Sequence, residues 1–187
     1  MIFIFTFLVC LLVCLLLFVL LAKFNPLWVM NHLVFSLKVK RFKNLPYDGV
    51  DCQHERHTLD LYVPKKTNKN KPVLVFIHGG SWDEGHKNDY EFAGSALANL
   101  GYVTAIMNYR LYPQVQFPGF IEDMAAAIAS LPRQLSQLNI AAASPLNIIL
   151  MGHSAGAHSA AILAANPSYL TKANARVNVS GFIGFAG

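Results

Sequence analysis

The stretch Gly152-His153-Ser154-Ala155-Gly156 lies between an apolar run, Leu146 to Met151, and an amphipathic stretch, Ser154 to Ala165. The run is typical of a buried strand, and the stretch after it predicts a helix that ends before Pro167. A serine at a sharp strand-to-helix turn, with a glycine two residues to either side, is the pattern of a nucleophile elbow. The alternative is that Ser154 is only a helix N-cap, because G-x-S-x-G also occurs by chance.

The two glycines of this pattern have a physical reason. The backbone of an elbow passes close to its neighbours, and Gly152 and Gly156 carry no side chain that would collide there. The serine would stand at the amino end of the helix, where free N–H groups and the helix dipole favour developing negative charge. We therefore predict that the N–H of Ala155 is one donor to an oxyanion.

A second motif, His78-Gly79-Gly80-Ser81-Trp82, directly follows the apolar run that starts at Val73. This is where the loop with the other oxyanion donors lies in lipases and esterases, and its glycines let backbone N–H groups turn inward. The motif favours the elbow over the N-cap interpretation of Ser154. Two alternatives stay open: His78 either braces the loop or is an ordinary loop histidine, and Trp82 either walls an acyl pocket or belongs to the core.

The rest of the chain alternates short apolar runs with helical stretches. Such alternation indicates βαβ units and a mostly parallel sheet, which is α/β architecture. The spacing of a dinucleotide-binding G-x-G-x-x-G is absent. The expected strands are 58–63, on a half-exposed edge and closed by Pro64, 73–78, 102–109, 146–151 and 177–185, and the expected helices are 91–100, 121–138 and 154–165.

From about Tyr47 onward the sequence resembles the α/β-hydrolases of the hormone-sensitive-lipase and carboxylesterase-like branch. The motifs that carry the resemblance are Leu59-Asp60-Leu61-Tyr62 with Pro64, His78 to Trp82, Asn108-Tyr109-Arg110-Leu111 with Pro113, Phe117-Pro118 with Glu122-Asp123, and Gly152 to Gly156. The resemblance implies an α/β-hydrolase fold, with helices on both faces of the sheet. It also implies a small-molecule ester substrate and needs no metal or cofactor.

In this family the amides of residues matching Gly80 and Ser81 point into the oxyanion hole with that of Ala155, and Gly79 belongs to the same loop. Many members have a third glycine at the position of Ser81. The H-G-G-x-W form resembles a subgroup of feruloyl-esterase-like and arylformamidase-like enzymes. Arg110 and Asp123 match positions that look structural in the family, and we expect a buried or half-buried ion pair; the alternative is two separate surface charges.

The acid and the base of the site are not found downstream of the serine. The fold needs an Asp or Glu and then a His after the nucleophile, yet only His158 follows Ser154. His158 lies one helical turn further on and cannot take the serine proton, and Asp83 and His86 belong to the region of the oxyanion loop. We therefore expect a partial sequence that is inactive on its own, with the missing residues on strands beyond Gly187.

The first 22 residues contain one polar side chain, Thr6, and no charge. At 1.5 Å per residue a helix of this length would be about 33 Å long, so we predict a transmembrane anchor over 1–22. A cleaved signal peptide is the alternative, although the run is long and lacks a basic start. Residues 24–37 predict an interfacial helix, and we place a basic juxtamembrane segment at 23–46 and the partial hydrolase domain at 47–187.

Five cations precede the first anion, Asp48, and without them the chain has ten basic and ten acidic residues; the five are Lys23, Lys38, Lys40, Arg41 and Lys43. This cluster predicts contact with membrane lipid through residues 1–43 and, by the positive-inside tendency, a domain that faces the cytoplasm. The alternative is a solvated basic linker. A nucleic-acid partner is not indicated, because the globular part is neutral.

The leading hypothesis is therefore a membrane-anchored serine carboxylic-ester hydrolase that acts through an acyl-enzyme on Ser154. Two alternatives stay open: a non-catalytic hydrolase-fold protein that binds a ligand or partner in the same pocket, and a membrane-surface scaffold. Three cysteines, two of them inside the apolar N-terminal run, predict neither a disulfide framework nor a metal site.

Overall fold

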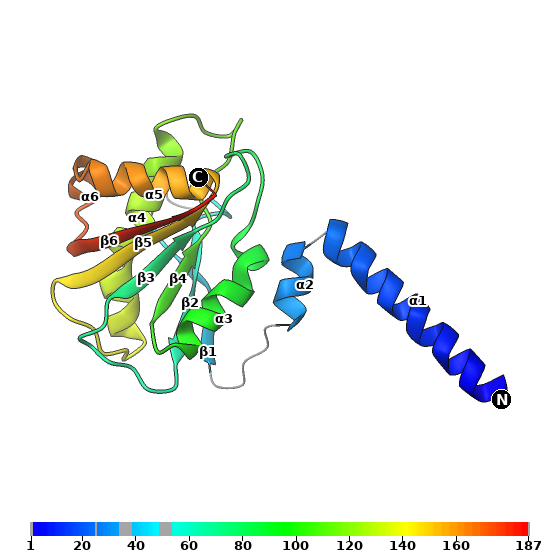
Figure 1. The fold of residues 1–187 in the computed structure, drawn as a ribbon. Coiled ribbons are helices and arrows are strands. Elements are labelled where there is room, and N and C mark those ends of the chain that lie inside the picture. The colour runs from blue at the N-terminus through cyan, green and yellow to red at the C-terminus, as the bar shows by residue number, and fades with distance from the viewer. Residues whose placement is uncertain (1, 25, 34–38, 49–53, 187) are drawn as a thin grey trace.

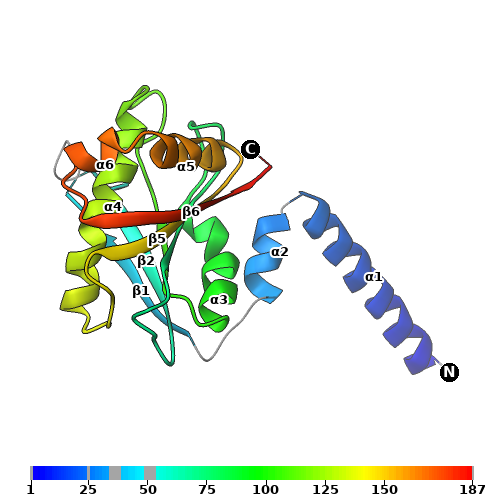
Figure 2. The same cartoon turned by 60° about the vertical axis from the view of Figure 1, so that its left-hand side comes forward.

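The computed structural model describes residues 2–24, 26–33, 39–48 and 54–186. In this part of the chain a twisted sheet has the strand order β1-β2-β4-β3-β5-β6 (Figures 1 and 2). β3, β4, β5 and β6 are parallel, whereas β1 pairs antiparallel with β2 and β2 antiparallel with β4. The strands are β1 (Val39–Pro46), β2 (Thr58–Pro64), β3 (Val73–Ile77), β4 (Thr104–Met107), β5 (Leu146–His153) and β6 (Val177–Phe185).

Helices cover both faces of this sheet. α3 (Glu91–Asn99) lies on one face, and α4 (Gly119–Gln137), α5 (Ala155–Ala165) and α6 (Ser168–Lys172) lie on the other (Figure 1). β3 shows how the layers form, because Val75 and Ile77 join the core under α4 and α5 while Leu74 and Phe76 join the core under α3. A strand buried on both faces reads as a continuous apolar run. The predicted α/β class with a mostly parallel sheet is confirmed.

The edge of the sheet differs from the prediction. We predicted that the strand beginning near His57 lies on a half-exposed edge, but β2 is buried and β1 pairs along its open side. β1 lies inside the predicted juxtamembrane segment, so the sheet begins upstream of residue 47. Its basic residues are those of an edge strand, where charge discourages pairing with other chains. Arg41 Nη1 lies 3.1 Å from Glu91 Oε2, and Lys43 also pairs with Glu91.

The N-terminal region contains two helices, α1 (Ile2–Phe24) and α2 (Pro26–Leu33), and α1 extends away from the sheet (Figures 1 and 2). Among the residues that the structure describes in full, no helix is both long and apolar enough to cross a membrane. The transmembrane prediction for residues 1–22 is therefore unsupported. Lipid contact through residues 1–43 and a cytoplasmic domain stay predictions. Within the predicted interfacial segment, 24–37, the structure shows the helix α2, and residues 25 and 34–37 lie outside the described part; an interfacial position of α2 stays a prediction.

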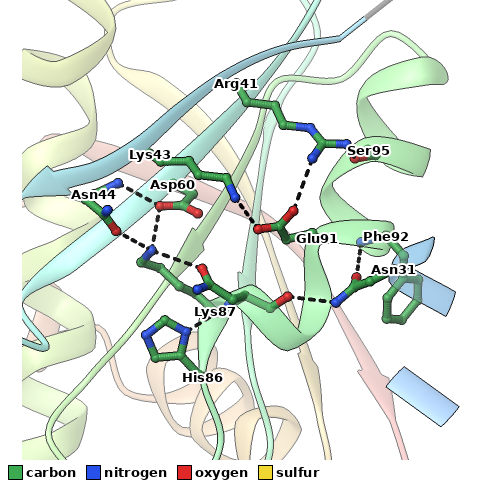
Figure 3. Close-up of polar contacts among 11 residues, drawn as sticks. Asn31, Arg41, Lys43, Asn44, Asp60, His86, Lys87, Glu91, Phe92 and Ser95 are labelled. Carbon is green, nitrogen blue, oxygen red and sulfur yellow. Dashed lines mark hydrogen bonds and ion pairs between the residues drawn. The ribbon is translucent and has the colours of Figure 1, made fainter. Parts of the chain in front are cut away.

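A buried ion pair fixes the segment that follows the loop after β3. Lys87, at the start of the short 3-10 helix η1 (Lys87–Tyr90), places its Nζ atom 2.7 Å from Asp60 Oδ1 on β2, and both side chains are 1% exposed. The same ammonium donates to Asn44 Oδ1 at 2.7 Å, and Lys87 N donates to Asn108 Oδ1 at 2.8 Å. Figure 3 shows Lys87 among these partners from β1 and β2. A buried charge needs such partners, because water is excluded.

Candidate active site

Ser154 occupies a strained turn between β5 and α5. Its backbone angles are φ 51° and ψ −122°, a left-handed conformation that L-residues other than glycine rarely adopt. The carbonyl oxygen of Ser154 accepts the first helical bonds of α5, from Ala157 N at 2.8 Å and His158 N at 3.1 Å. Ser154 N donates to Phe185 O at 2.8 Å, which ties the turn to the end of β6. The serine therefore lies at the carboxyl end of the sheet, where an elbow presents its hydroxyl.

The glycines that flank the serine pack against backbone. A Cβ atom on Gly152 would lie 2.3 Å from Gly156 O, and one on Gly156 would lie 2.2 Å from Ile77 O and 2.5 Å from His78 O. Only the absence of a side chain allows α5 to approach the end of β3 this closely. The elbow is therefore in close contact with the end of β3, which leads into the loop His78 to Trp82.

The loop His78 to Trp82 folds directly against the elbow. A Cβ atom on Gly79 would lie 2.7 Å from His153 O and 3.2 Å from Ser154 Cβ. Gly80 has φ 116°, and its carbonyl oxygen accepts bonds from Asp83 N at 3.0 Å and Glu84 N at 2.9 Å. Ser81 adopts φ 48°, a left-handed angle that a third glycine would reach without strain. The structure therefore brings both sequence motifs to one place.

His78 braces this loop from inside the protein. Its side chain is fully buried, its Nδ1 atom lies 2.8 Å from Gly79 O, and its ring stacks on Tyr109 at a centroid distance of 4.4 Å. Tyr109 in turn donates its hydroxyl to His78 O at 3.0 Å. Burial lowers the pKa of His78 to about 3, so the imidazole is neutral and Nδ1–H donates to the Gly79 carbonyl. The bracing role is the one that the structure supports.

This burial predicts a pH dependence of stability. An unfolded histidine takes up a proton as pH falls below about 6.5, whereas folded His78 stays neutral down to about pH 3, so stability falls with pH through this window. We expect the loss of unfolding free energy between pH 7 and pH 5 to be about 2 kcal/mol smaller in His78→Asn than in the wild type. Urea unfolding at both pH values measures it. His158→Asn, at an exposed site, serves as the control, and an equal loss in wild type and His78→Asn would contradict the prediction.

Trp82 ties the loop to the helix of the elbow. Its indole Nε1–H donates to Ser159 Oγ at 3.1 Å, and its ring stacks on Phe120 at a centroid distance of 5.9 Å. His158 meets the same ring edge-on at 5.5 Å. Trp82 is only partly buried and packs against the main core. Its contacts therefore favour the core interpretation, and they also anchor the carboxyl end of the loop to α5.

Tyr90, at the end of η1, was not singled out by the sequence. Its hydroxyl oxygen lies 2.9 Å from Nδ1 of His153, the residue between Gly152 and Ser154. The tyrosine lies in a stretch between the two recognisable motifs, for which no strand or helix was expected. Only the fold brings it to the elbow.

Arg110 and Asp123 lie together, away from solvent. Arg110 Nε and Nη2 donate to Asp123 Oδ2 and Oδ1 at 2.9 and 2.8 Å, and Arg110 N donates to Oδ2 at 3.0 Å. His57 Nε2 lies 3.3 Å from Asp123 Oδ2. Asp123 is on α4, and Arg110 follows β4, so the pair joins the helix to the sheet. The alternative of two separate surface charges is wrong.

In the described part of the chain, no hydrogen bond joins the Ser154 side chain to a histidine or a carboxylate. His158 is exposed on α5 and rests against Trp82. His86 caps η1. Its Nδ1 atom accepts from Asn88 N at 3.1 Å, and its backbone N–H donates to Asp89 Oδ2 at 2.9 Å. The described residues therefore place Ser154 and the loop Gly79 to Trp82 side by side, without a base hydrogen-bonded to the serine.

Curated relatives of this chain are hydrolases. A probable isoprenylcysteine alpha-carbonyl methylesterase of Arabidopsis thaliana is 36% identical over 124 residues, which cover 66% of this chain and 27% of that protein. A kynurenine formamidase of Salmo salar is 29% identical over 120 residues, which cover 64% of this chain and 37% of that protein. The chain thus spans well under half the length of either relative.

Solved structures agree with this result. An esterase B from Lactobacillus rhamnosis superimposes with a TM-score of 0.65 and 27% identity, over 87% of this chain and 53% of that chain. A bacterial heroin esterase superimposes with a TM-score of 0.62 and 25% identity, over 89% of this chain and 52% of that chain. Among family models, the one described as BD-FAE matches residues 59–181, which include the oxyanion loop and the elbow. The chain therefore belongs to the BD-FAE family, within the hormone-sensitive-lipase and carboxylesterase-like α/β-hydrolases.

Proposed function

We propose that the protein is a serine carboxylic-ester hydrolase that works through an acyl-enzyme on Ser154. The observation that carries the proposal is the strained turn at Ser154 with the loop Gly79 to Trp82 packed directly against it. Strain of this kind is costly and tends to persist at functional sites. A helix N-cap needs neither a left-handed serine nor a glycine loop folded over it.

The chemistry assigns one role to each part of the site. Ser154 Oγ forms a bond to the acyl carbon, and its proton passes to a histidine base and then to the departing alcohol. The amides of Gly80, Ser81 and Ala155 hold the oxyanion that forms, and water then cleaves the acyl-serine bond to release the acid. The described residues include no histidine or carboxylate that is hydrogen-bonded to Ser154, so we propose that the chain as given has little or no turnover.

The substrate class follows from the relatives. Two named activities, methylesterase and esterase, act on carboxylic esters, and a third, formamidase, acts on a formamide. In all three reactions the bond between a carbonyl carbon and an oxygen or nitrogen atom is hydrolysed. A nucleophilic serine with an oxyanion loop catalyses this kind of reaction. We propose a small-molecule ester as the substrate.

A fluorophosphonate probe tests the proposal on the protein expressed from its complete open reading frame. We expect one labelled residue, Ser154, identified by mass spectrometry of the labelled peptide, because the probe reacts with a serine activated by a base. Prior acid denaturation should abolish the labelling. A well-folded full-length protein that stays unlabelled would favour the alternative, a hydrolase-fold protein that binds ligands without catalysis.

A further inference from the structure

Tyr90 lies at the contact between the elbow and the oxyanion loop. Its side chain is 5% exposed, and its ring packs on Phe76 and Phe92 at centroid distances of 5.1 and 6.1 Å. Its hydroxyl oxygen is 2.9 Å from His153 Nδ1. Burial raises the pKa of this hydroxyl, and a hydrogen-bond interaction with the backbone of Gly79 opposes that rise. The phenol therefore contacts His153, the residue of the elbow that lies directly beside Gly79.

The two halves are in direct contact at this point. A Cβ atom on Gly79 would lie 2.7 Å from His153 O and 3.0 Å from His153 Nδ1. Gly79 precedes the proposed donors Gly80 and Ser81, and His153 precedes the serine and the donor Ala155. A shift of His153 against Gly79 would thus change the separation of the donors, and misplacement by about 1 Å can cost 10²-fold in rate.

The position of Tyr90 is set by the body of the domain. At one end of η1, Lys87 is held by the buried pair with Asp60. At the other end, Asn31 of α2 accepts a bond from Phe92 N at 2.8 Å and donates to Asn88 O at 2.8 Å, as Figure 3 shows. Asn31 therefore caps α3 from a distant part of the chain, because Tyr90 at the N-cap offers no side-chain acceptor. The phenol projects from a segment that is fixed on both sides.

We infer that Tyr90 is a positioning residue that acts through His153 to fix the position of the elbow relative to the oxyanion loop. The inference rests on the proposed ester hydrolysis, because it concerns the donors of that reaction. We assign the Tyr90 hydroxyl as the donor and His153 Nδ1 as the acceptor, which corresponds to the imidazole tautomer with its proton on Nε2. Tyr90 itself does not touch the reacting atoms.

The first test is Tyr90→Phe in the protein expressed from its complete open reading frame. Phenylalanine keeps the ring contacts and removes only the hydroxyl, so we expect kcat for a p-nitrophenyl ester to fall about 10-fold with KM within about twofold of wild type. Tyr47→Phe is the matched control, because the buried Tyr47 hydroxyl donates to Asn108 O at 2.7 Å and not to a residue of the elbow. Both variants lose one hydrogen bond made by a buried tyrosine, but only Tyr90→Phe should lose turnover.

The second test separates a positioning role from a general loss of stability. His153→Asn can keep an acceptor near the position of Nδ1 and should stay within about threefold of wild-type kcat, whereas His153→Leu should lose about 10-fold. The double variant Tyr90→Phe/His153→Leu should be no slower than either single variant, because both remove the same interaction. Losses that multiply to about 100-fold would overturn the inference.

Ser154→Ala distinguishes the two levels of the argument. If that variant is inactive and Tyr90→Phe has the kcat of wild type, the proposed function stands and the role of Tyr90 is refuted. Equal losses of kcat in Tyr90→Phe and Tyr47→Phe would refute it as well. If Ser154→Ala still hydrolyses the ester, the proposed function fails, and the inference fails with it.

Discussion

Ser154→Ala is expected to lower kcat for ester hydrolysis by about 10⁴–10⁶-fold in the protein expressed from its complete open reading frame, with little change in KM. The methyl group cannot form the acyl-enzyme, while the proposed oxyanion donors, the amides of Gly80, Ser81 and Ala155, are retained. Initial rates with a short-chain p-nitrophenyl ester measure the effect. The rate that remains should exceed the spontaneous hydrolysis in buffer only by what the oxyanion loop contributes.

The control is a serine that lies outside the site. Ser168 begins α6, is exposed, and donates its hydroxyl to Asn166 Oδ1 at 2.7 Å. Ser168→Ala should keep the wild-type rate, because surface substitutions rarely change more than local stability. Turnover in Ser154→Ala within tenfold of wild type would show that this serine is not the nucleophile.

The elbow and the oxyanion loop could be found in the sequence because each is a local pattern. An apolar run predicts a buried strand, and the residues that follow it need glycine for reasons of backbone geometry alone. The contacts of Gly152 and Gly156 show the steric reason that we gave for them. The ion pair of Arg110 with Asp123 was reached in another way, through the resemblance to a family, because the two lie on different elements.

Tertiary contacts explain what the sequence did not reveal. The alternation of residues 58–63 predicts a half-exposed strand, yet Asp60 is buried because Lys87, from another element, neutralises it. We interpreted the residues of β1 as a basic juxtamembrane segment because of their positive charges. Their pairing with β2 could not be predicted from the segment itself. Tyr90 carries no local signal at all. Its role arises only when η1 is fixed beside the elbow.

Gly156→Ala is expected to lower the free energy of unfolding by about 3 kcal/mol or more and to slow fluorophosphonate labelling of Ser154 by at least about 10-fold. The new Cβ would lie 2.2 Å from Ile77 O and 2.5 Å from His78 O. Both atoms are backbone at the end of β3, so the collision cannot be relieved by a side-chain rotation. α5 must move away from the sheet, and the elbow must separate from the loop that starts at His78.

A glycine with room beside it provides the matched control for that variant. A Cβ atom on Gly181, in β6, would make an ordinary contact with Ile149 Cγ1 at 3.6 Å, so Gly181→Ala should change stability by no more than about 0.5 kcal/mol. Urea unfolding compares the two variants, and the labelling rate reports the site. If Gly156→Ala matched Gly181→Ala in both measurements, the close approach of α5 to β3 would not be required. The steric explanation of the G-x-S-x-G pattern in this chain would then be wrong.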